Sequence, residues 1–395
     1  MVQEDLKWLQ TTAAVRSRSQ QMLELARENK LKCFTLQEDR LEFLADQVAE
    51  ITKKNYPNLK IPFHSRWRHL SAGGIDRGEE LRQEMAGLSS EEKLRVSFDL
   101  MFISVLLDAG AGPQWSFRDA GRIYRRSEGL AVASWQMFRQ GVFSSTGEAY
   151  RVDAQGLTQL TVEHLARGLR VSERNPLTGL EGRVGLLNRL GQAAKTNSVF
   201  QGSFARPGCM ADRFHSPVDA TSVMEQVLKG LKDVWPARME IDGIQLGDVW
   251  SHPLIQGAGV TNHLVPFHKL SQWLTYSLIE TLMEYGVRVD GLDQMTGLAE
   301  YRNGGLFVDS GVLEVKSKQD LQVVHQPDSE MIVEWRSMTV ALLDVLRPLV
   351  EDRLQVELPL ACMLEGGTWA LGRQLANEKR GGPPPIQTLS DGTIF

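Results

Sequence analysis

Apolar residues recur every three or four positions along most of the chain, and this spacing constrains the fold more than any other feature. In residues 37–54, for example, Leu41, Leu44, Val48 and Ile51 fall on one face of a helix, with charged residues between them. The same periodicity predicts further helices at residues 4–29, 128–140, 153–169, 179–195, 219–235, 266–285, 329–354 and 358–379. Most of the chain is therefore predicted to be α-helical.

Capping and strand signals complete the predicted fold class. Ser89 and Glu92 have the spacing of a capping box, and residues 94–106 after them are almost wholly apolar, which is typical of a helix buried on most sides. Strand patterns occur only at residues 238–244, around an Asp-Gly turn, and at residues 306–315. We therefore expect an all-α fold with minor β.

The length of 395 residues suits one large domain or two to three smaller ones. No linker rich in Pro, Gly or Ser precedes the Gly-Gly-Pro-Pro-Pro run at residues 381–385. We therefore favour one large single helical domain over residues 1–395. The alternative is two lobes, an N-terminal group of helices at residues 1–150 and a catalytic core at 151–395, with a cleft between them.

The charge balance favours a small-molecule ligand. The chain has 44 Lys and Arg residues against 49 Asp and Glu residues, a formal net charge of −5, and no cluster of five or more basic residues. Nucleic acid and anionic membrane surfaces are therefore not expected as partners. The sequence leaves the oligomeric state open.

Cysteine usage and the absence of several motifs narrow the chemistry. The three cysteines, Cys33, Cys209 and Cys362, form no CxxC pair, which argues against a disulfide framework or a thiolate zinc site and favours a reducing compartment. The N-terminus does not resemble a signal peptide, and the apolar run at residues 100–107 is far shorter than the ~18 residues of a membrane span, so we expect a cytoplasmic protein. GxxxxGK[ST], a GxGxxG after a strand, GxSxG and HExxH are absent, so hydrolysis of nucleoside triphosphates, Rossmann redox chemistry, α/β-hydrolase acylation and zincin proteolysis are not expected. We expect no cofactor and identify no metal ligands, and the sequence leaves open whether a metal assists.

A dense group of chemically active side chains occupies residues 63–69, where His64, Arg66, Arg68 and His69 surround a tryptophan. Arginine binds phosphate with two parallel hydrogen bonds, so this segment is a candidate site for an anionic or hydroxylated ligand. An exposed patch of stacked Arg and Trp explains the same residues equally well.

Asp108 ends the apolar helix, where the negative end of the helix dipole repels a carboxylate by ~0.3–1 kcal/mol. It either faces a ligand pocket and binds a donor or a sugar hydroxyl, or it turns back onto the amides of the glycine loop at residues 109–112. We favour the second interpretation.

Two adjoining segments combine an acid, bases and aromatic rings. Asp248, Trp250 and His252 alternate along an extended run, so their side chains are expected on one side; a loop in which Asp248 caps a turn is the alternative. The helix predicted after Pro266 carries an ammonium, an amide and a phenol on one face, from Lys269, Gln272 and Tyr276.

Glu300, Tyr301 and Arg302 precede the Gly304-Gly305 pair, and the glycines would allow a ligand close to the backbone. The alternative is an exposed Glu300–Arg302 ion pair of little consequence. Carboxylates together with Arg, Lys and aromatic side chains suit the cleavage of a glycosidic bond, because Asp or Glu can activate water and stabilise an oxocarbenium-like transition state.

Eight motifs along the chain resemble those of the uracil-catabolism protein four family of fungi and bacteria. They are FHSRWRH, SVLLDAGAG, RSEGLAVAS, NPLTGLEGR, LVPFHKLSQWLTYSLIE, LAEYRNGGLF, EGGTWALGR and SDGTIF. This resemblance implies a step in the degradation of uracil through its ribosylated form, with ribosylurea as an intermediate and urea as a product.

A second set of motifs is similar, in order and spacing, to the queuosine salvage family, whose members are helical nucleosidases. These motifs are LLDAGAG, LGD, FHKLSQ, TGLAEYR and SEMIVEWRSMTVALL. The resemblance implies a DNA-glycosylase-like helical core. It matches Asp248 to an Asp, Lys269 to a Lys, Glu300 to an Asp and Arg302 to an Arg of that family.

Our hypothesis is an N-glycosidase that hydrolyses ribosylurea, or its 5′-phosphate, to urea and ribose or ribose phosphate. One of Glu300 and Asp248 would activate water and stabilise charge at the anomeric carbon, and the other would bind ribose hydroxyls or assist the departing nitrogen. A phosphate would be bound by Lys269 together with Arg66, Arg68 or Arg302. The rings expected to stack on the planar urea are those of Trp273 and Tyr301.

Two other functions are weighed against this hypothesis. A non-catalytic helical partner protein of the uracil-degradation pathway would present a large exposed apolar patch in place of a polar pocket. A glycosylase acting on nucleic acid is chemically possible through base flipping, but the negative net charge counts against it.

Overall fold

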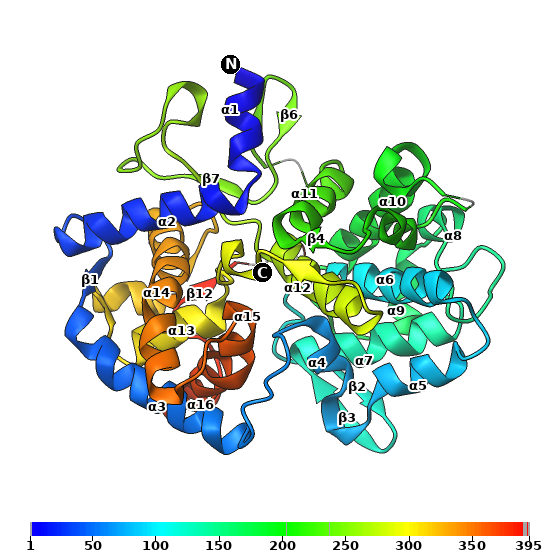
Figure 1. Cartoon of the computed structure of the whole chain (residues 1–395), viewed down its shortest axis with the longest axis horizontal. Helices are drawn as coiled ribbons and strands as arrows, with labels where there is room; N and C mark the ends of the chain where they lie inside the picture. The colour runs from blue at the N-terminus through cyan, green and yellow to red at the C-terminus, as the bar shows by residue number, and fades with distance from the viewer. Residues whose placement is uncertain (1, 203, 237, 390–392, 394–395) are drawn as a thin grey trace. The chain divides into compact units, whose positions relative to one another are not determined.

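The computed structural model describes residues 2–202, 204–236, 238–389 and 393. Helices dominate this part of the chain and the strands are short (Figure 1), so the predicted all-α fold with minor β is confirmed. None of the described helices is long and apolar enough to cross a bilayer.

The chain folds into two compact units. Unit 1 contains Met1–His64, Asp248–Gln272 and Gly291–Leu389, and unit 2 contains Ser65–Gly247, Trp273–Asp290 and the C-terminal end. The boundary falls within the helix α12 (Lys269–Glu284), between Gln272 and Trp273. Each unit draws on segments from both sides of residue 150, and the predicted domain boundaries stay a prediction.

The helix α14 (Glu330–Leu354) forms the core of unit 1. Every side chain from Met331 to Leu343 is buried, because neighbouring helices pack against the helix along its length (Figure 1). Those helices are α2 (Thr12–Arg27), α3 (Leu41–Asn55), α13 (Tyr301–Asp309) and α15 (Leu360–Met363). The other elements of unit 1 are α1 (Val2–Leu9), α16 (Trp369–Arg380), β1 (Phe34–Leu36), β7 (Val249–Ser251), β8 (Leu264–Pro266), β10 (Leu313–Val315), β11 (Val324–His325) and β12 (Gln387–Thr388).

The helix α6 (Ser90–Leu106) has the same role in unit 2. It begins at the predicted capping box, where the Ser89 hydroxyl accepts a hydrogen bond from the Glu92 backbone N–H at 3.2 Å. All of its residues from Val96 onward are buried, as predicted, and they pack against α7 (Arg126–Arg139), α10 (Leu180–Thr196) and a 3₁₀ segment at Pro207–Arg213. The other elements of unit 2 are α4 (Arg66–Leu70), α5 (Arg77–Glu84), α8 (Ala154–Thr158), α9 (Val162–Gly168), α11 (Ala220–Leu231), β2 (Ser116–Asp119), β3 (Arg122–Arg125), β4 (Val218–Asp219), β5 (Glu240–Ile241), β6 (Ile244–Gln245) and β9 (Val289–Asp290).

The described strands form two-stranded ladders within each unit. Four of these pairs are antiparallel, β1–β10, β2–β3, β5–β6 and β7–β8, and two are parallel, β4–β9 and β11–β12. The pair β5–β6 is the hairpin predicted around the Asp-Gly turn.

Three predicted elements differ in the structure. The helix predicted at residues 4–29 is two helices, α1 and α2, because Thr11 accepts a hydrogen bond from the backbone N–H of Ala14 and starts a new helix. The helix predicted at residues 153–169 is two helices, α8 and α9, because Thr161 accepts a hydrogen bond from the backbone N–H of His164 and starts a new helix. The strand predicted at residues 306–315 is wrong for its first part, which belongs to α13; only β10 is extended.

Candidate functional site

Asp248 lies immediately before β7, and its carboxylate accepts four hydrogen bonds within unit 1. The Trp250 indole N–H donates to Oδ1 at 2.6 Å, and the backbone N–H of Lys269 donates to Oδ2 at 2.9 Å. The Arg336 guanidinium donates one hydrogen bond to each oxygen, both at 2.8 Å. The predicted convergence of Asp248 and Trp250 is therefore present, while Lys269 approaches Asp248 through its backbone.

Arg336 connects Asp248 to the segment that contains Glu300. It comes from the middle of α14 and is 4% exposed. Its Nε donates to the backbone carbonyl of Ala299, the residue before Glu300, at 3.2 Å, and its guanidinium carbon lies 4.1 Å from the centroid of the Phe267 ring. One buried cation thus links the two predicted acidic positions.

The ion pair fixes the protonation state of Asp248. Burial alone would raise the pKa of this carboxyl, but the charge and the hydrogen bonds of Arg336 outweigh burial and hold the pKa below its usual value. Asp248 is therefore a permanent carboxylate near neutral pH. Such a group is a weak proton acceptor, but it can bind hydroxyl groups and stabilise positive charge.

Glu300 caps the N-terminus of α13 and has a different environment. Its Oε2 accepts the backbone N–H of Arg302 and its Oε1 accepts that of Asn303, each at 2.6 Å. Each carboxylate oxygen has a further lone pair, so a water molecule or a substrate hydroxyl can still bind. Glu300 is 8% exposed and Arg302 is 5% exposed, so the alternative of a surface ion pair is wrong.

Buried polar atoms without partners follow Glu300 directly. Arg302 Nε and both polar atoms of the Asn303 side-chain amide have no hydrogen-bond partner among the described residues. Asn303 is fully buried. A buried polar group left unpaired costs about 1–3 kcal/mol, so the fold is destabilised next to Glu300 in a way that a ligand could compensate.

Aromatic rings surround the Arg302 side chain. Its guanidinium carbon lies 5.3 Å from the centroid of the Tyr301 ring and 5.9 Å from that of Trp369 at the start of α16. The ring of His64 lies 5.6 Å from the same Trp369 ring. Unit 1 therefore brings together five of the predicted residues: Asp248, Lys269, Glu300, Arg302 and Tyr301, with His64 joined to them through Trp369.

The other predicted residues lie in unit 2, where Arg66 and Asp108 form a buried ion pair. The guanidinium of Arg66 donates to Asp108 at 2.6 Å and to the Ser104 hydroxyl at 2.7 Å, and Ser127 donates to Asp108 at 3.0 Å. The favoured interpretation of Asp108, a carboxylate bound to the amides of the following glycine loop, is therefore wrong. Arg66 neutralises the charge that the helix dipole disfavours.

Trp273 and Arg68 are also held inside unit 2. The Trp273 ring centroid lies 5.4 Å from the Arg66 guanidinium carbon and 5.4 Å from the ring of His69. Arg68 pairs with Glu280 at 2.8 Å. Within residues 63–69, Arg66, Trp67 and His69 are each less than 9% exposed, so the alternative of an exposed Arg–Trp patch is wrong.

Three residues that the sequence offered as ligand-facing are buried. Gln272 donates to the Phe267 carbonyl at 2.9 Å and accepts from the Thr296 hydroxyl at 2.6 Å. Tyr276 is 1% exposed. His252 is fully buried, with its Nε2 3.4 Å from Glu334. Gln272 and His252 belong to unit 1, and Tyr276 belongs to unit 2.

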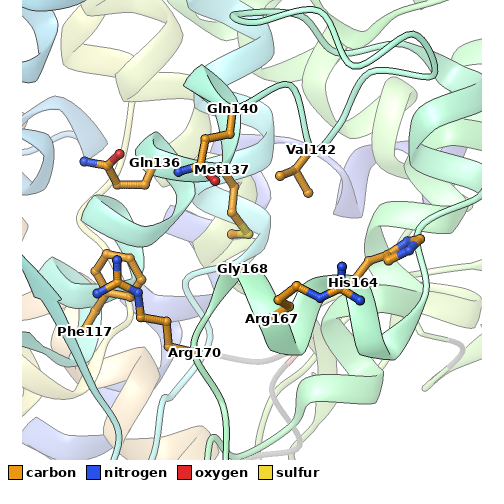
Figure 2. A pocket seen from close by; sticks show the side chains of 9 residues that line it. All are labelled: Phe117, Gln136, Met137, Gln140, Val142, His164, Arg167, Gly168 and Arg170. Atoms are coloured by element: carbon orange, nitrogen blue, oxygen red, sulfur yellow. The ribbon is translucent and has the colours of Figure 1, made fainter.

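A separate hollow of about 340 Å³ lies in unit 2 (Figure 2). Its walls come from β2, α7 and α9 and the loops that follow them, and the Arg170 guanidinium carbon lies 4.5 Å from the centroid of the Phe117 ring. None of the predicted site residues lines it: the lining residues are Phe117, Gln136, Met137, Gln140, Val142, His164, Arg167, Gly168 and Arg170. Among the described residues, no group of three or more His, Cys, Asp or Glu side chains could hold a metal ion.

The contacts of Arg336 and Glu365 are not predicted from the sequence. Arg336 lies in the motif SEMIVEWRSMTVALL and Glu365 in the motif EGGTWALGR. A signal was present for Arg336, because a charged residue inside an apolar helix requires a buried partner. The motif SDGTIF lies outside the described residues except for Thr393.

A family model described as "Protein of unknown function (DUF1688)" matches residues 8–395, and the chain belongs to this family. "Uracil catabolism protein 4" of Lachancea kluyveri is 36% identical over 437 aligned positions, which cover 100% of both chains. "Protein urg3" of Schizosaccharomyces pombe (strain 972 / ATCC 24843) is 39% identical over 397 positions, which cover 96% of both chains. The resemblance to the uracil-catabolism protein four family is confirmed.

Proposed function

We propose that this protein acts in uracil catabolism as an N-glycosidase that hydrolyses ribosylurea, or its 5′-phosphate, to urea and ribose or ribose phosphate. The name of the Lachancea kluyveri relative, which matches the whole chain, supports the pathway. The observation that carries the reaction is the position of Arg336, which binds the Asp248 carboxylate and the Ala299 carbonyl and so holds the two acidic positions in one cluster.

The two carboxylates have different roles in the proposed reaction. Glu300 accepts a proton from water, the oxygen of that water bonds to the anomeric carbon of ribose, and the carbon–nitrogen bond breaks with its electron pair going to urea. Glu300 is suited to this step because its carboxylate accepts hydrogen bonds from two backbone N–H groups, which hold it in place and carry no full charge. Asp248, which Arg336 keeps ionised, binds ribose hydroxyls and stabilises the positive charge that develops on the sugar.

Asn303 is suited to recognise the leaving group. Its side-chain amide presents an N–H and a C=O, which complement the C=O and N–H of the urea moiety. Both groups are buried without partners among the described residues, three residues after Glu300 and in the first turn of the helix that Glu300 caps. Without a bound substrate, the Asn303 N–H and C=O groups stay unpaired. Each then carries the free-energy cost of a buried polar group without a hydrogen bond, about 1–3 kcal/mol.

The experiment that tests this function uses the purified full chain with ribosylurea and, separately, with ribosylurea 5′-phosphate. Urea and the sugar product are both measured by mass spectrometry. The proposal expects urea and ribose, or ribose phosphate, in equal amounts from at least one of the two substrates. No urea above an enzyme-free blank from either substrate refutes it. In that case the chain is a non-catalytic member of the pathway or acts on another compound.

A further inference from the structure

A π-helical turn in unit 1 carries a third carboxylate, and Trp369 after it contacts the Arg302 guanidinium of the proposed site. The segment runs from α15 through a π-helix at Leu364–Thr368 into α16 without a break. Single π turns are rare and often occur at functional sites. This turn carries Glu365, whose Oε2 lies 2.8 Å from His64 Nδ1 and whose Oε1 accepts a hydrogen bond from the Tyr56 hydroxyl at 3.3 Å.

The glycines after Glu365 allow this placement. A Cβ on Gly367 would lie 2.6 Å from the Thr52 hydroxyl and 2.6 Å from the Val48 side chain, both on α3. The two glycines therefore allow the π turn to lie directly on α3, and Tyr56 follows that helix. The motif Glu-Gly-Gly encodes both the carboxylate and the close packing that positions it.

The backbone positions the histidine equally firmly. The backbone N–H of His64 donates to the carbonyl of Ala361 in α15 at 2.9 Å. The His64 side chain is 5% exposed and that of Glu365 is 17% exposed. The Trp369 ring, one turn after Glu365, contacts both the His64 ring and the Arg302 guanidinium. The pair therefore shares an aromatic neighbour with the segment that begins at Glu300.

A carboxylate at Nδ1 has a defined effect on an imidazole. It fixes the tautomer that carries a proton on Nδ1, sets the orientation of the ring and stabilises the imidazolium form. The other nitrogen, Nε2, is then the atom that gives up a proton. The remaining requirement of the proposed reaction is a proton for the departing urea nitrogen, because an anionic urea is a poor leaving group.

We propose that His64 is the general acid of this reaction and that Glu365 is its positioning residue; this inference rests on the proposed function. As the bond between the anomeric carbon and nitrogen breaks, its electron pair moves to nitrogen, and that nitrogen takes the proton from His64 Nε2. Water supplies the hydroxyl group on the sugar and transfers its proton to Glu300. That proton returns to His64 through solvent, so one water molecule is consumed and the enzyme is regenerated.

The test compares two substrates that differ in their need for an acid. Ribosylurea needs a proton on its leaving group, whereas p-nitrophenyl riboside releases a stable phenolate and needs none. We expect His64→Gln to lower kcat/KM for ribosylurea by about 100-fold or more, in line with the usual contribution of a general acid, and to change kcat/KM for the nitrophenyl riboside by less than about threefold. Glu300→Gln should lower kcat/KM for both substrates.

Glu365→Gln reports the positioning role through the same pair of substrates. Loss of the carboxylate removes the group that fixes the imidazole tautomer and ring orientation, so kcat for ribosylurea should fall with KM nearly unchanged, while kcat/KM for the nitrophenyl riboside changes by less than about threefold. His325→Gln, a substitution in β11 outside the site, is the matched control and should behave as the wild type. Circular dichroism spectra and melting temperatures establish that each variant is folded.

The possible results separate this inference from the proposed function. If the wild-type chain releases urea and His64→Gln is equally active on ribosylurea, or equally impaired on both substrates, His64 is not the general acid and the proposed function stands. If Glu365→Gln leaves kcat for ribosylurea unchanged, or lowers kcat/KM equally for both substrates, the positioning role of Glu365 is refuted. If the wild-type chain releases no urea, the proposed function fails, and this inference fails with it.

Discussion

Removal of the Arg336 guanidinium is the sharpest test of how the site is built. Arg336→Met keeps a long apolar side chain in α14 but leaves the Asp248 carboxylate without its cation. Breaking a buried ion pair from one side costs about 3–5 kcal/mol. The Asp248 side chain is 22% exposed, so water can partly solvate its unpaired charge. We therefore expect the free energy of unfolding to fall by an amount near the lower end of that range.

The free energy of unfolding is measured at pH 7 with guanidinium chloride as the denaturant. Circular dichroism and tryptophan fluorescence both monitor the unfolding, and coincident transitions establish two-state behaviour. Arg353→Met is the matched control, because Arg353 pairs with Glu42 and Asp46, whose side chains are 62% and 60% exposed. Exposed pairs contribute about 0–1 kcal/mol, so this variant should be close to the wild type.

A double-mutant cycle isolates the ion pair. Asp248→Asn combined with Arg336→Met leaves no orphan charge, so the double variant should be more stable than the sum of the single losses predicts, by up to about 3 kcal/mol. Additive losses would refute the reasoning, because they would mean that the two side chains do not interact.

The pH dependence follows from the lowered pKa of Asp248. Because folding lowers this pKa, the pair contributes its full stabilisation above the unfolded value of about 3.9 and loses it as the pH falls through the folded value. The difference in unfolding free energy between the wild type and Arg336→Met should therefore shrink below about pH 4. A constant difference between pH 7 and pH 3 would contradict this account.

Three further predictions address the site and its surroundings. Asn303→Leu replaces the unpaired polar atoms by methyl groups in the same branched shape, so the gain from removing them should offset the cost of the larger side chain and leave the melting temperature little changed, while kcat/KM falls; a fall in both would assign Asn303 a structural role only. Gly372→Ala places a Cβ 2.5 Å from the Arg302 carbonyl and should lower the free energy of unfolding by about 1–3 kcal/mol. Gly87→Ala is the control, because its Cβ meets nothing within 4 Å. Equal denaturation midpoints for the two variants would contradict the packing of α13 on α16. Burial raises the pKa of the Cys33 thiol to about 12, so alkylation at pH 8 should be slow until the chain is denatured; rapid modification of Cys33 in the native state, detected by peptide mass spectrometry, would refute this.

The sequence predicts elements well where the signal is local. Apolar periodicity predicts the buried helix α6, and the Ser89 side chain accepts the backbone N–H of Glu92, as the capping pattern predicts. The strand predicted after Gly305 was wrong at its start because Glu, an uncommon N-cap residue, begins α13. The apolar alternation in this segment predicts a strand, whereas the Glu300 cap starts a helix. Sequence preferences for the N-cap position favour Ser, Thr, Asp and Asn, so they do not indicate this helix start.

The candidate site depends on contacts between residues distant in the sequence, and these are harder to predict. Arg336 and Asp248 are 88 positions apart, and His64 and Glu365 are 301 positions apart. Nothing local in either segment indicates its partner. The segment at residues 63–69 shows the same effect, because His64 folds with unit 1 whereas Arg66 folds with unit 2 and pairs with Asp108. Composition alone could not separate these roles.

The rate of urea release by matched carboxylate variants tests the central claim most directly. We expect Glu300→Gln and Asp248→Asn each to lower kcat/KM for the active ribosylurea substrate by about 100-fold or more, while the exposed substitutions Glu357→Gln and Asp352→Asn leave it unchanged. Full activity in folded Glu300→Gln and Asp248→Asn would show that neither carboxylate takes part in the reaction.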